Sequence, residues 1–144
     1  MPRLAVRAVL LHRGRLCLVN AWPGEHSDLW CAPGGGVEPD TDLTGNLRRE
    51  VHEETGLAIA VGPPCLVNEY HAPERGFHQV EVFFRCSLLS GRLDPAWADP
   101  EGIVNRRRWV TQAEMLGMRV KPDHLRAVAW SGRTLYDPLE RLVN

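Results

Sequence analysis

Three glutamates near the middle of the chain have a spacing that suits metal binding. Glu50, Glu53 and Glu54 occupy positions i, i+3 and i+4, so on an α-helix their side chains project from the same side. Like charges at this spacing destabilise an isolated helix by about 0.2–0.5 kcal/mol per pair. A cation that prefers oxygen ligands would turn this repulsion into a binding site. The expected chemistry is therefore that of a bound divalent metal ion.

The residues around these glutamates predict a glycine-rich loop that leads into a helix. The three glycines at 34–36 allow backbone angles closed to other residues, so this loop can approach a ligand closely. The helix is expected to begin near Thr41 or Asp42, whose side chains can cap free amide groups. Gly56 suits the end of the same helix.

The position of the glutamates on this helix separates two interpretations. A bare E-x-x-E-E motif more often forms a solvated acidic face than a metal site. Leu47 and Val51, however, mark an apolar stripe, and at about 100° per residue Glu50 and Glu54 lie directly beside it. Carboxylates on a packing border need partners, so their position after the glycines favours the metal site.

Composition limits the fold and the partners of the chain. Its 144 residues are 44% hydrophobic and 24% charged, which predicts one ordinary folded domain over residues 1–144. The net charge of −1 gives no global basic field, so nucleic acid is not an expected partner. No apolar run approaches the length that spans a membrane. The dispersed cysteines form no C-x-x-C pair, so free thiols and a reducing, cytoplasmic location are expected for Cys17, Cys31, Cys65 and Cys86.

Alternating apolar runs and turn residues predict an α/β fold in which helices cover a mixed sheet. A break is expected at Gly62-Pro63-Pro64, and 91–102 is expected to be a polar loop. Two further helices are expected, a short one from Thr111 and another over 122–130, whereas 131–144 has no assigned element. Strands are expected over residues 4–11, 15–19, 29–33, 57–61, 65–70, 79–89 and 103–110.

The central segment resembles the signature of the Nudix hydrolase family, G-x5-E-x7-R-E-U-x-E-E-x-G-U, in which U is aliphatic. The match begins at Gly35, continues at the correct spacing and differs at one position, where Thr41 replaces the first glutamate. In the family that glutamate supports the loop and helix through the signature arginine, here Arg49. Arg49 is therefore expected to bind Asp40, Asp42 or a more distant acid instead. The matching residues are Arg49, Glu50, Val51, Glu53, Glu54, Gly56 and Leu57.

This resemblance implies an α/β/α sandwich and hydrolysis within the diphosphate of a nucleoside diphosphate linked to another moiety. Nucleoside triphosphates, ADP-ribose or other nucleotide sugars, and dinucleoside polyphosphates are the substrate candidates. Mg²⁺ or Mn²⁺ is the implied cofactor. Carried onto this sequence, the metal-ligand candidates are Glu50, Glu53 and Glu54, with the carbonyl of Gly34 as a further one.

The general base has candidates in two places, because related enzymes use either the helix of the signature or a later loop. Glu53 and Glu50 are the first candidates. Glu101 in the loop before R-R-R-W-V is the distal one, with Glu74 behind it. For both loop residues, an exposed acid without a catalytic role is the commoner case.

Substrate contacts are expected from arginines within strands and from aromatic side chains in loops. Arg7 and Arg85 lie within apolar strands, where an inward-facing guanidinium needs an anionic partner. That partner is either a substrate phosphate or ribose, or the carboxylate of Glu81. Tyr70 is a base-stacking candidate together with Trp22 and Phe77. Backbone groups of Gly35 and Gly36 complete the set.

Two other functions remain as alternatives to a small-molecule pyrophosphohydrolase. A catalytically weak or silent Nudix domain could bind a nucleotide and act as a regulatory module, which the intact glutamates oppose and Thr41 mildly favours. Hydrolysis at an RNA 5′ end would require several phosphate contacts, and the near-neutral charge disfavours it. Assembly into a homodimer is left open.

Overall fold

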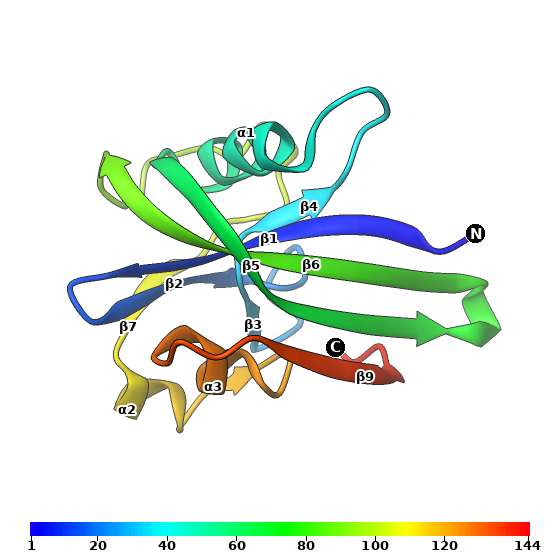
Figure 1. Cartoon of the computed structure of the whole chain (residues 1–144). Helices are drawn as coiled ribbons and strands as arrows, with labels where there is room; N and C mark the ends of the chain where they lie inside the picture. Colours follow the sequence, from blue (N-terminus) through cyan, green and yellow to red (C-terminus); the bar gives the residue numbers. More distant parts are fainter.

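A curled nine-stranded mixed sheet runs through the computed structural model, which describes residues 1–144 (Figure 1). The main path of the sheet has the order β8-β3-β2-β1-β6-β5-β9, while β4 pairs with β1 and β7 pairs with β2. The helices are α1 (Leu43–Thr55), the 3-10 turn η1 (Pro73–Arg75), α2 (Gln112–Met115) and α3 (Leu125–Ala129). The strands are β1 (Arg3–His12), β2 (Arg15–Asn20), β3 (Leu29–Cys31), β4 (Gly34–Gly36), β5 (Ala58–Ala72), β6 (Phe77–Ser90), β7 (Arg107–Val110), β8 (Arg119–Val120) and β9 (Leu135–Arg141).

Helices cover both faces of this sheet, which confirms the expected α/β class. Figure 1 shows α1 on one face and α2 and α3 on the other. Strand alternation sends β1 side chains to both sides. One core cluster therefore joins Val6 and Leu10 to α1, and a second joins Val9 to α3. The largest fully buried side chains of the two clusters include Leu47, Val51, Leu57, Leu66, Phe83 and Leu125.

Helix α1 has the boundaries that its sequence predicts. The Asp42 carboxylate caps its N-terminus by accepting a hydrogen bond from the backbone N–H of Gly45 at 3.2 Å. Gly56 ends the helix in the left-handed conformation, and its N–H donates to the carbonyl of His52. None of the helices is both long and apolar enough to cross a membrane.

The prediction of a loop at the three consecutive glycines is wrong, because Gly34–Gly36 form strand β4. They pair antiparallel with β1, so that Gly34 lies opposite Arg7 and Gly35 opposite Val6. An added Cβ at Gly34 would collide with the backbone of Val6, and φ at this residue is +153°. Glycine is thus required here for close packing of two backbones.

Three other expected boundaries also differ from the structure. Strand β5 continues through Gly62-Pro63-Pro64, where register shifts against β6 leave Pro63 without a partner and place Pro64 opposite Phe84. The strand expected over 103–110 is shortened to Arg107–Val110, because Asn20 Oδ1 accepts the N–H groups of Asn105 and Arg106. The helix expected over 122–130 covers only Leu125–Ala129. The unassigned tail contains β9, which pairs in parallel with β5.

Candidate active site

A cleft of about 630 Å³ lies beside β4 and the inward side of α1. Its lining includes the signature acids Glu50 and Glu54 and also Glu101 from the loop before β7. Backbone of Gly34, Gly35 and Gly36 contributes to the same wall. The aromatic candidates Trp22, Tyr70 and Phe77 line it as well.

The acidic group beside α1 differs from the one expected from the helix alone, and its member Glu53 is not among the residues that line the cleft. Oxygen atoms of Glu50, Glu53 and Glu101 all lie within 4.8 Å of one another. Glu54 lies outside this group, and its Oε1 accepts the backbone N–H of Gly34 at 2.9 Å. The distal candidate Glu101 therefore joins two of the three glutamates of the signature, although it is 48 positions from Glu53 and 51 from Glu50 in sequence.

Glu74, the other loop candidate, lies elsewhere. Its carboxylate pairs with Arg141 at 2.8 Å and is exposed in η1, between β5 and β6. It is absent from the cleft lining. The structure thus separates the two loop acids and leaves Glu101 alone near the helix.

Burial makes the negative charge of the cleft costly. Glu50 and Glu54 are only 7% and 8% exposed. Burial raises the pKa of Glu54 from 4.5 to about 8, opposed by the positive charge of Arg7 and the hydrogen bond from Gly34. Burial also raises the pKa of Glu50, with Arg49 acting in the opposite direction. Buried carboxylates and an all-oxygen donor group are suited to Mg²⁺ or Mn²⁺.

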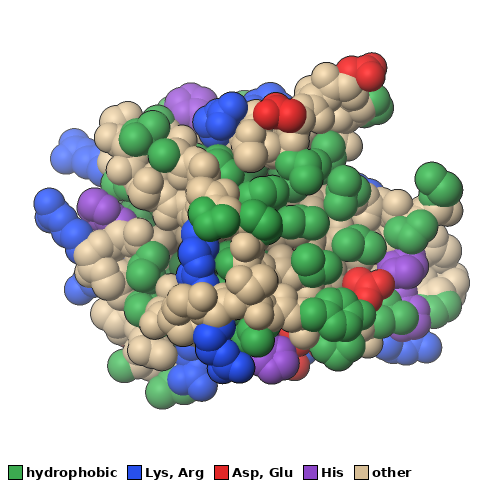
Figure 2. Space-filling view, in the orientation of Figure 1, with side chains coloured by type: hydrophobic (Ala, Val, Ile, Leu, Met, Phe, Trp, Pro, Cys, Tyr) green, Lys and Arg blue, Asp and Glu red, His purple; other side chains and the backbone are tan.

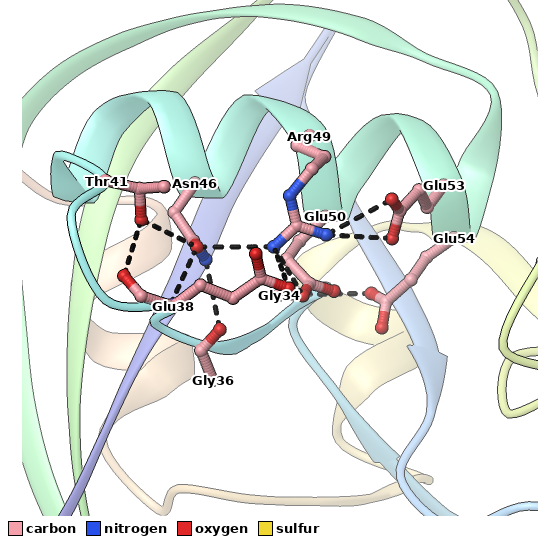
Figure 3. Close-up of polar contacts among 9 residues, drawn as sticks. All are labelled: Gly34, Gly36, Glu38, Thr41, Asn46, Arg49, Glu50, Glu53 and Glu54. Atoms are coloured by element: carbon pink, nitrogen blue, oxygen red, sulfur yellow. Dashed lines mark hydrogen bonds and ion pairs between the residues drawn. The ribbon is translucent and has the colours of Figure 1, made fainter.

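Arg49 connects the acids along the helix (Figure 3). Its Nη1 lies 3.1 Å from both carboxylate oxygens of Glu53, and its Nη2 lies 3.3 Å from Glu50 Oε1. A longer contact of 3.5 Å joins Nη2 to Glu38. Pairing with Asp40 or Asp42 is therefore wrong. Asp42 is occupied as the helix cap, and Asp40 lies in a left-handed turn.

Asn46 was missed by the sequence reasoning although its side chain is central to this network. The residue is 2% exposed, and its Oδ1 lies 3.2 Å from Arg49 Nη2 (Figure 3). A signal was available, since Asn46 precedes Arg49 by three positions and Glu50 by four. Those spacings place all three residues on one side of a helix.

The loop that carries Glu101 is held by two side chains that the sequence reasoning also missed. Asp99 accepts the backbone N–H groups of Glu101 and Val104 at 3.0 and 2.9 Å. Asn20 Nδ2 donates to the carbonyl of Ile103 at 2.9 Å. These contacts fix the path of the loop next to α1. Asp and Asn near a turn commonly bond to nearby backbone, but the sequence does not reveal which side chain lies opposite.

Arg7 and Arg85 have different surroundings. Arg7 lines the cleft, and its Nε donates to Glu81 Oε2 at 2.8 Å. Glu81 was one of the two partners expected for Arg7, the other being a substrate phosphate or ribose. The prediction that Arg85 contacts substrate in the cleft is wrong. Arg85 does not line the cleft, and its guanidinium donates to the carbonyls of Val128 and Arg133 at 3.0 and 2.7 Å. It lies further along β6, where α3 covers the same face of the sheet.

The three consecutive arginines before Trp109 bind protein groups and do not line the cleft. Arg106 donates to the carbonyls of Gly24 and Ser27, and Arg108 pairs with Glu114. Arg107 donates to the carbonyls of Glu54 and Val104, so it links the end of α1 to the Glu101 loop. Their role is to connect elements.

Comparison with known proteins gives a consistent family match. A family model described as the NUDIX domain matches residues 1–131. A Bacillus subtilis protein named "Putative ADP-ribose pyrophosphatase YjhB" is 27% identical over 94 residues, which cover 63% of this chain and 44% of that protein. Mouse diphosphoinositol polyphosphate phosphohydrolase 3-alpha is 33% identical over 84 residues, covering 58% of this chain and 48% of the relative. The chain thus spans about half the length of these curated relatives.

Solved structures share the fold. A crystal structure of a UDP-X diphosphatase superimposes with a TM-score of 0.71 at 23% identity, covering 97% of this chain and 68% of that chain. An ADP-ribose pyrophosphatase from Streptococcus suis superimposes with a TM-score of 0.67 at 21% identity, covering 97% of this chain and 100% of that chain. At sequence identities this low, the similarity to these structures shows a shared fold only.

Proposed function

Because the chain belongs to the NUDIX domain family, we propose that it is a metal-dependent hydrolase of the phosphoanhydride in a nucleoside diphosphate derivative. The observation that carries this proposal is the meeting of Glu101 with Glu50 and Glu53. These acids come from two separate elements, and two of them, Glu50 and Glu101, line the cleft. Their mutual repulsion suits a cation site.

Glu50, Glu53 and Glu101 would hold Mg²⁺ or Mn²⁺, with Glu54 and the carbonyl of Gly34 as further ligand candidates. When bound, such an ion neutralises charge on nonbridging phosphate oxygens and lowers the pKa of the attacking water. The protein orients its own carboxylates for this task. Arg49 binds both oxygens of Glu53 and one of Glu50.

Glu101 is our first choice as the general base. Both oxygens of Glu53 and Oε1 of Glu50 already accept hydrogen bonds from Arg49. Glu101 has no side-chain hydrogen bond or ion pair, so an oxygen remains available to accept a proton from water at the reacting phosphorus. This order reverses the expectation from sequence, which placed the two helix residues first.

The cleft favours a nucleotide over a more highly phosphorylated substrate. Four cationic side chains line it, namely Arg3, Arg7, Arg75 and Lys121. Arg7 is already paired with Glu81, and Lys121 with Asp123 and Glu140. Two unpaired cations suit the short diphosphate of a nucleotide derivative, whereas an inositol polyphosphate would need more. The aromatic side chains of Trp22, Tyr70 and Phe77 would stack on a base.

The test is a substrate panel with purified protein and Mg²⁺. Nucleoside triphosphates, ADP-ribose, UDP-sugars, dinucleoside polyphosphates and a diphosphoinositol polyphosphate are compared by released phosphate or monophosphate. We expect turnover of one nucleotide class and a loss of about 100-fold or more in kcat for Glu53→Gln or Glu101→Gln. Glu25→Gln is the matched control, because Glu25 is an exposed turn residue and is not among the residues that line the cleft.

The alternative function has a distinct outcome in the same experiment. Tight binding of one nucleotide without hydrolysis of any panel member would replace the enzyme by a regulatory nucleotide-binding module. If a 5′-triphosphorylated RNA is added to the panel, its turnover with a steep salt dependence would instead favour an RNA substrate. A homodimer and a cytoplasmic location stay predictions.

A further inference from the structure

The side chain of Asn46 joins three parts of the site that are separate in the chain. Its Nδ2 donates to the carbonyl of Gly36 at 3.1 Å, and its Oδ1 accepts the N–H of Glu38 at 3.1 Å. The same Oδ1 lies 3.2 Å from Arg49 Nη2 and 3.2 Å from Thr41 Oγ1. Figure 3 shows these contacts converging between the end of β4 and the first turns of α1.

The chemistry of these partners fixes the orientation of the amide. The N–H of Glu38 and the guanidinium of Arg49 can only donate, whereas the carbonyl of Gly36 can only accept. The oxygen of Asn46 must therefore face Arg49, and its nitrogen must face Gly36. Neither alanine nor aspartate could satisfy all of these partners.

Thr41 completes the arrangement at the surface. Its hydroxyl donates to the carbonyl of Glu38 at 2.7 Å and makes its longer contact with Asn46 Oδ1. It therefore closes the turn that connects β4 to α1 and packs it against the amide. A glutamate at this position would have supplied a carboxylate to Arg49, but Asn46 already supplies an acceptor there.

Charge around Arg49 explains why a neutral acceptor is sufficient. Three carboxylates, those of Glu38, Glu50 and Glu53, already lie within 3.5 Å of its guanidinium. A fourth would add negative charge beside Glu50, which is the buried carboxylate of the three. The amide oxygen of Asn46 accepts from the Arg49 guanidinium without adding a negative charge.

We infer that Asn46, with Thr41, takes the place of the missing signature glutamate and positions the metal-binding carboxylates through Arg49. Both are positioning residues, since Arg49 lies between them and Glu50 and Glu53. The inference rests on the proposed function, because it assumes that these carboxylates bind a divalent ion.

Mn²⁺ binding to the folded protein, measured by calorimetry or electron paramagnetic resonance without substrate, tests this inference. We expect Asn46→Ala to weaken Mn²⁺ binding about tenfold, as is typical when a residue that orients metal ligands is removed. Thr41→Glu in the Asn46→Ala background should recover most of the lost affinity by giving Arg49 a carboxylate. Thr44→Ala is the control, because its hydroxyl bonds only to the Asp42 side chain in the same helix turn.

The outcomes separate this inference from the proposed function. If folded Asn46→Ala binds Mn²⁺ as tightly as the wild type and only its unfolding temperature falls, Asn46 merely holds the turn and the inference is overturned. If Asn46→Ala does not fold, Thr41→Val at the exposed end of the network decides: weaker binding supports the inference, and wild-type affinity overturns it. A wild-type protein that binds no Mn²⁺ would contradict the proposed function itself, and the inference with it.

Discussion

Glu54 differs from the other acids of the site because its carboxylate is both buried and bonded to a backbone amide. It accepts the N–H of Gly34 at 2.9 Å, so it ties α1 to β4. Burial nevertheless dominates and raises its pKa from 4.5 to about 8. Between pH 4.5 and about 8, the Glu54 carboxyl of the metal-free folded protein therefore keeps a proton that the unfolded chain has released.

This difference gives a signed prediction for stability. Because the folded state binds more protons, the free energy of unfolding of the metal-free protein should fall as pH rises from about 4.5 to 8. Each unit of pKa shift corresponds to about 1.4 kcal/mol, so the total effect is on the order of a few kcal/mol. Urea unfolding at pH 5 and pH 8 with a chelator measures it.

Glu54→Gln is the diagnostic variant for this pH dependence, and Glu25→Gln is its exposed control. The glutamine cannot ionise, so we expect the variant to lose less stability than the wild type between the two pH values. Adding Mg²⁺ at pH 8 should stabilise the wild type, since bound metal favours the ionised carboxylates. An identical pH slope in wild type and Glu54→Gln would contradict the assignment.

Among the connecting elements, the loop that carries Glu101 has the clearest consequence for activity. The Asp99 carboxylate accepts the N–H groups of Glu101, Ile103 and Val104 at 3.0, 3.2 and 2.9 Å. Removing these acceptors should let the loop move and carry Glu101 away from Glu50. A displaced catalytic group lowers kcat more than it changes substrate binding.

We therefore expect Asp99→Ala to reduce kcat by about tenfold or more while KM changes little. Asp94→Ala is a matched control in the same polar segment, because Asp94 makes a similar bond to Ala96 N at 2.8 Å but does not bond to the Glu101 turn. Steady-state kinetics with the best panel substrate provides the comparison. Equal losses in both variants would mean that general loosening of the segment, rather than the position of Glu101, controls activity.

The same elements show how far the sequence could predict the structure. Helix α1 follows from local signals: Asp42 as a cap, Gly56 as a stop and an apolar stripe through Leu47. Strand β4 does not, because its glycines become a strand only through pairing with β1, which is distant in sequence. Glu101 was likewise a candidate, but its meeting with Glu50 depends on Asp99 and Asn20 holding the loop.

At the scale of the whole molecule, two core clusters lie on opposite faces of one sheet and serve different purposes. One packs α1, and with it Glu50 and Glu53, against β1 and β6. The other packs α3 against β1, β5 and β6, beyond the cleft. Hydrophobic side chains are also exposed on the side of the molecule shown in Figure 2. The exposed large hydrophobic residues of the chain include Leu4 at 40% and Tyr136 at 58%. Of the two clusters, only the one that contains Leu47 and Val51 of α1 packs against the helix that carries Glu50 and Glu53.

Truncating one leucine in each cluster separates support of the site from support of the fold. Leu47 on α1 and Leu125 on α3 are both fully buried, so alanine at either position should lower the free energy of unfolding by about 2–5 kcal/mol. We expect only Leu47→Ala to weaken Mn²⁺ binding as well, because a cavity under α1 lets the helix and its carboxylates shift. Urea unfolding and Mn²⁺ titration at a temperature where both variants remain folded give the two readouts. Equal weakening of Mn²⁺ binding by Leu125→Ala would show instead that the site responds to the stability of the whole sheet, and that its geometry is not set by α1 packing.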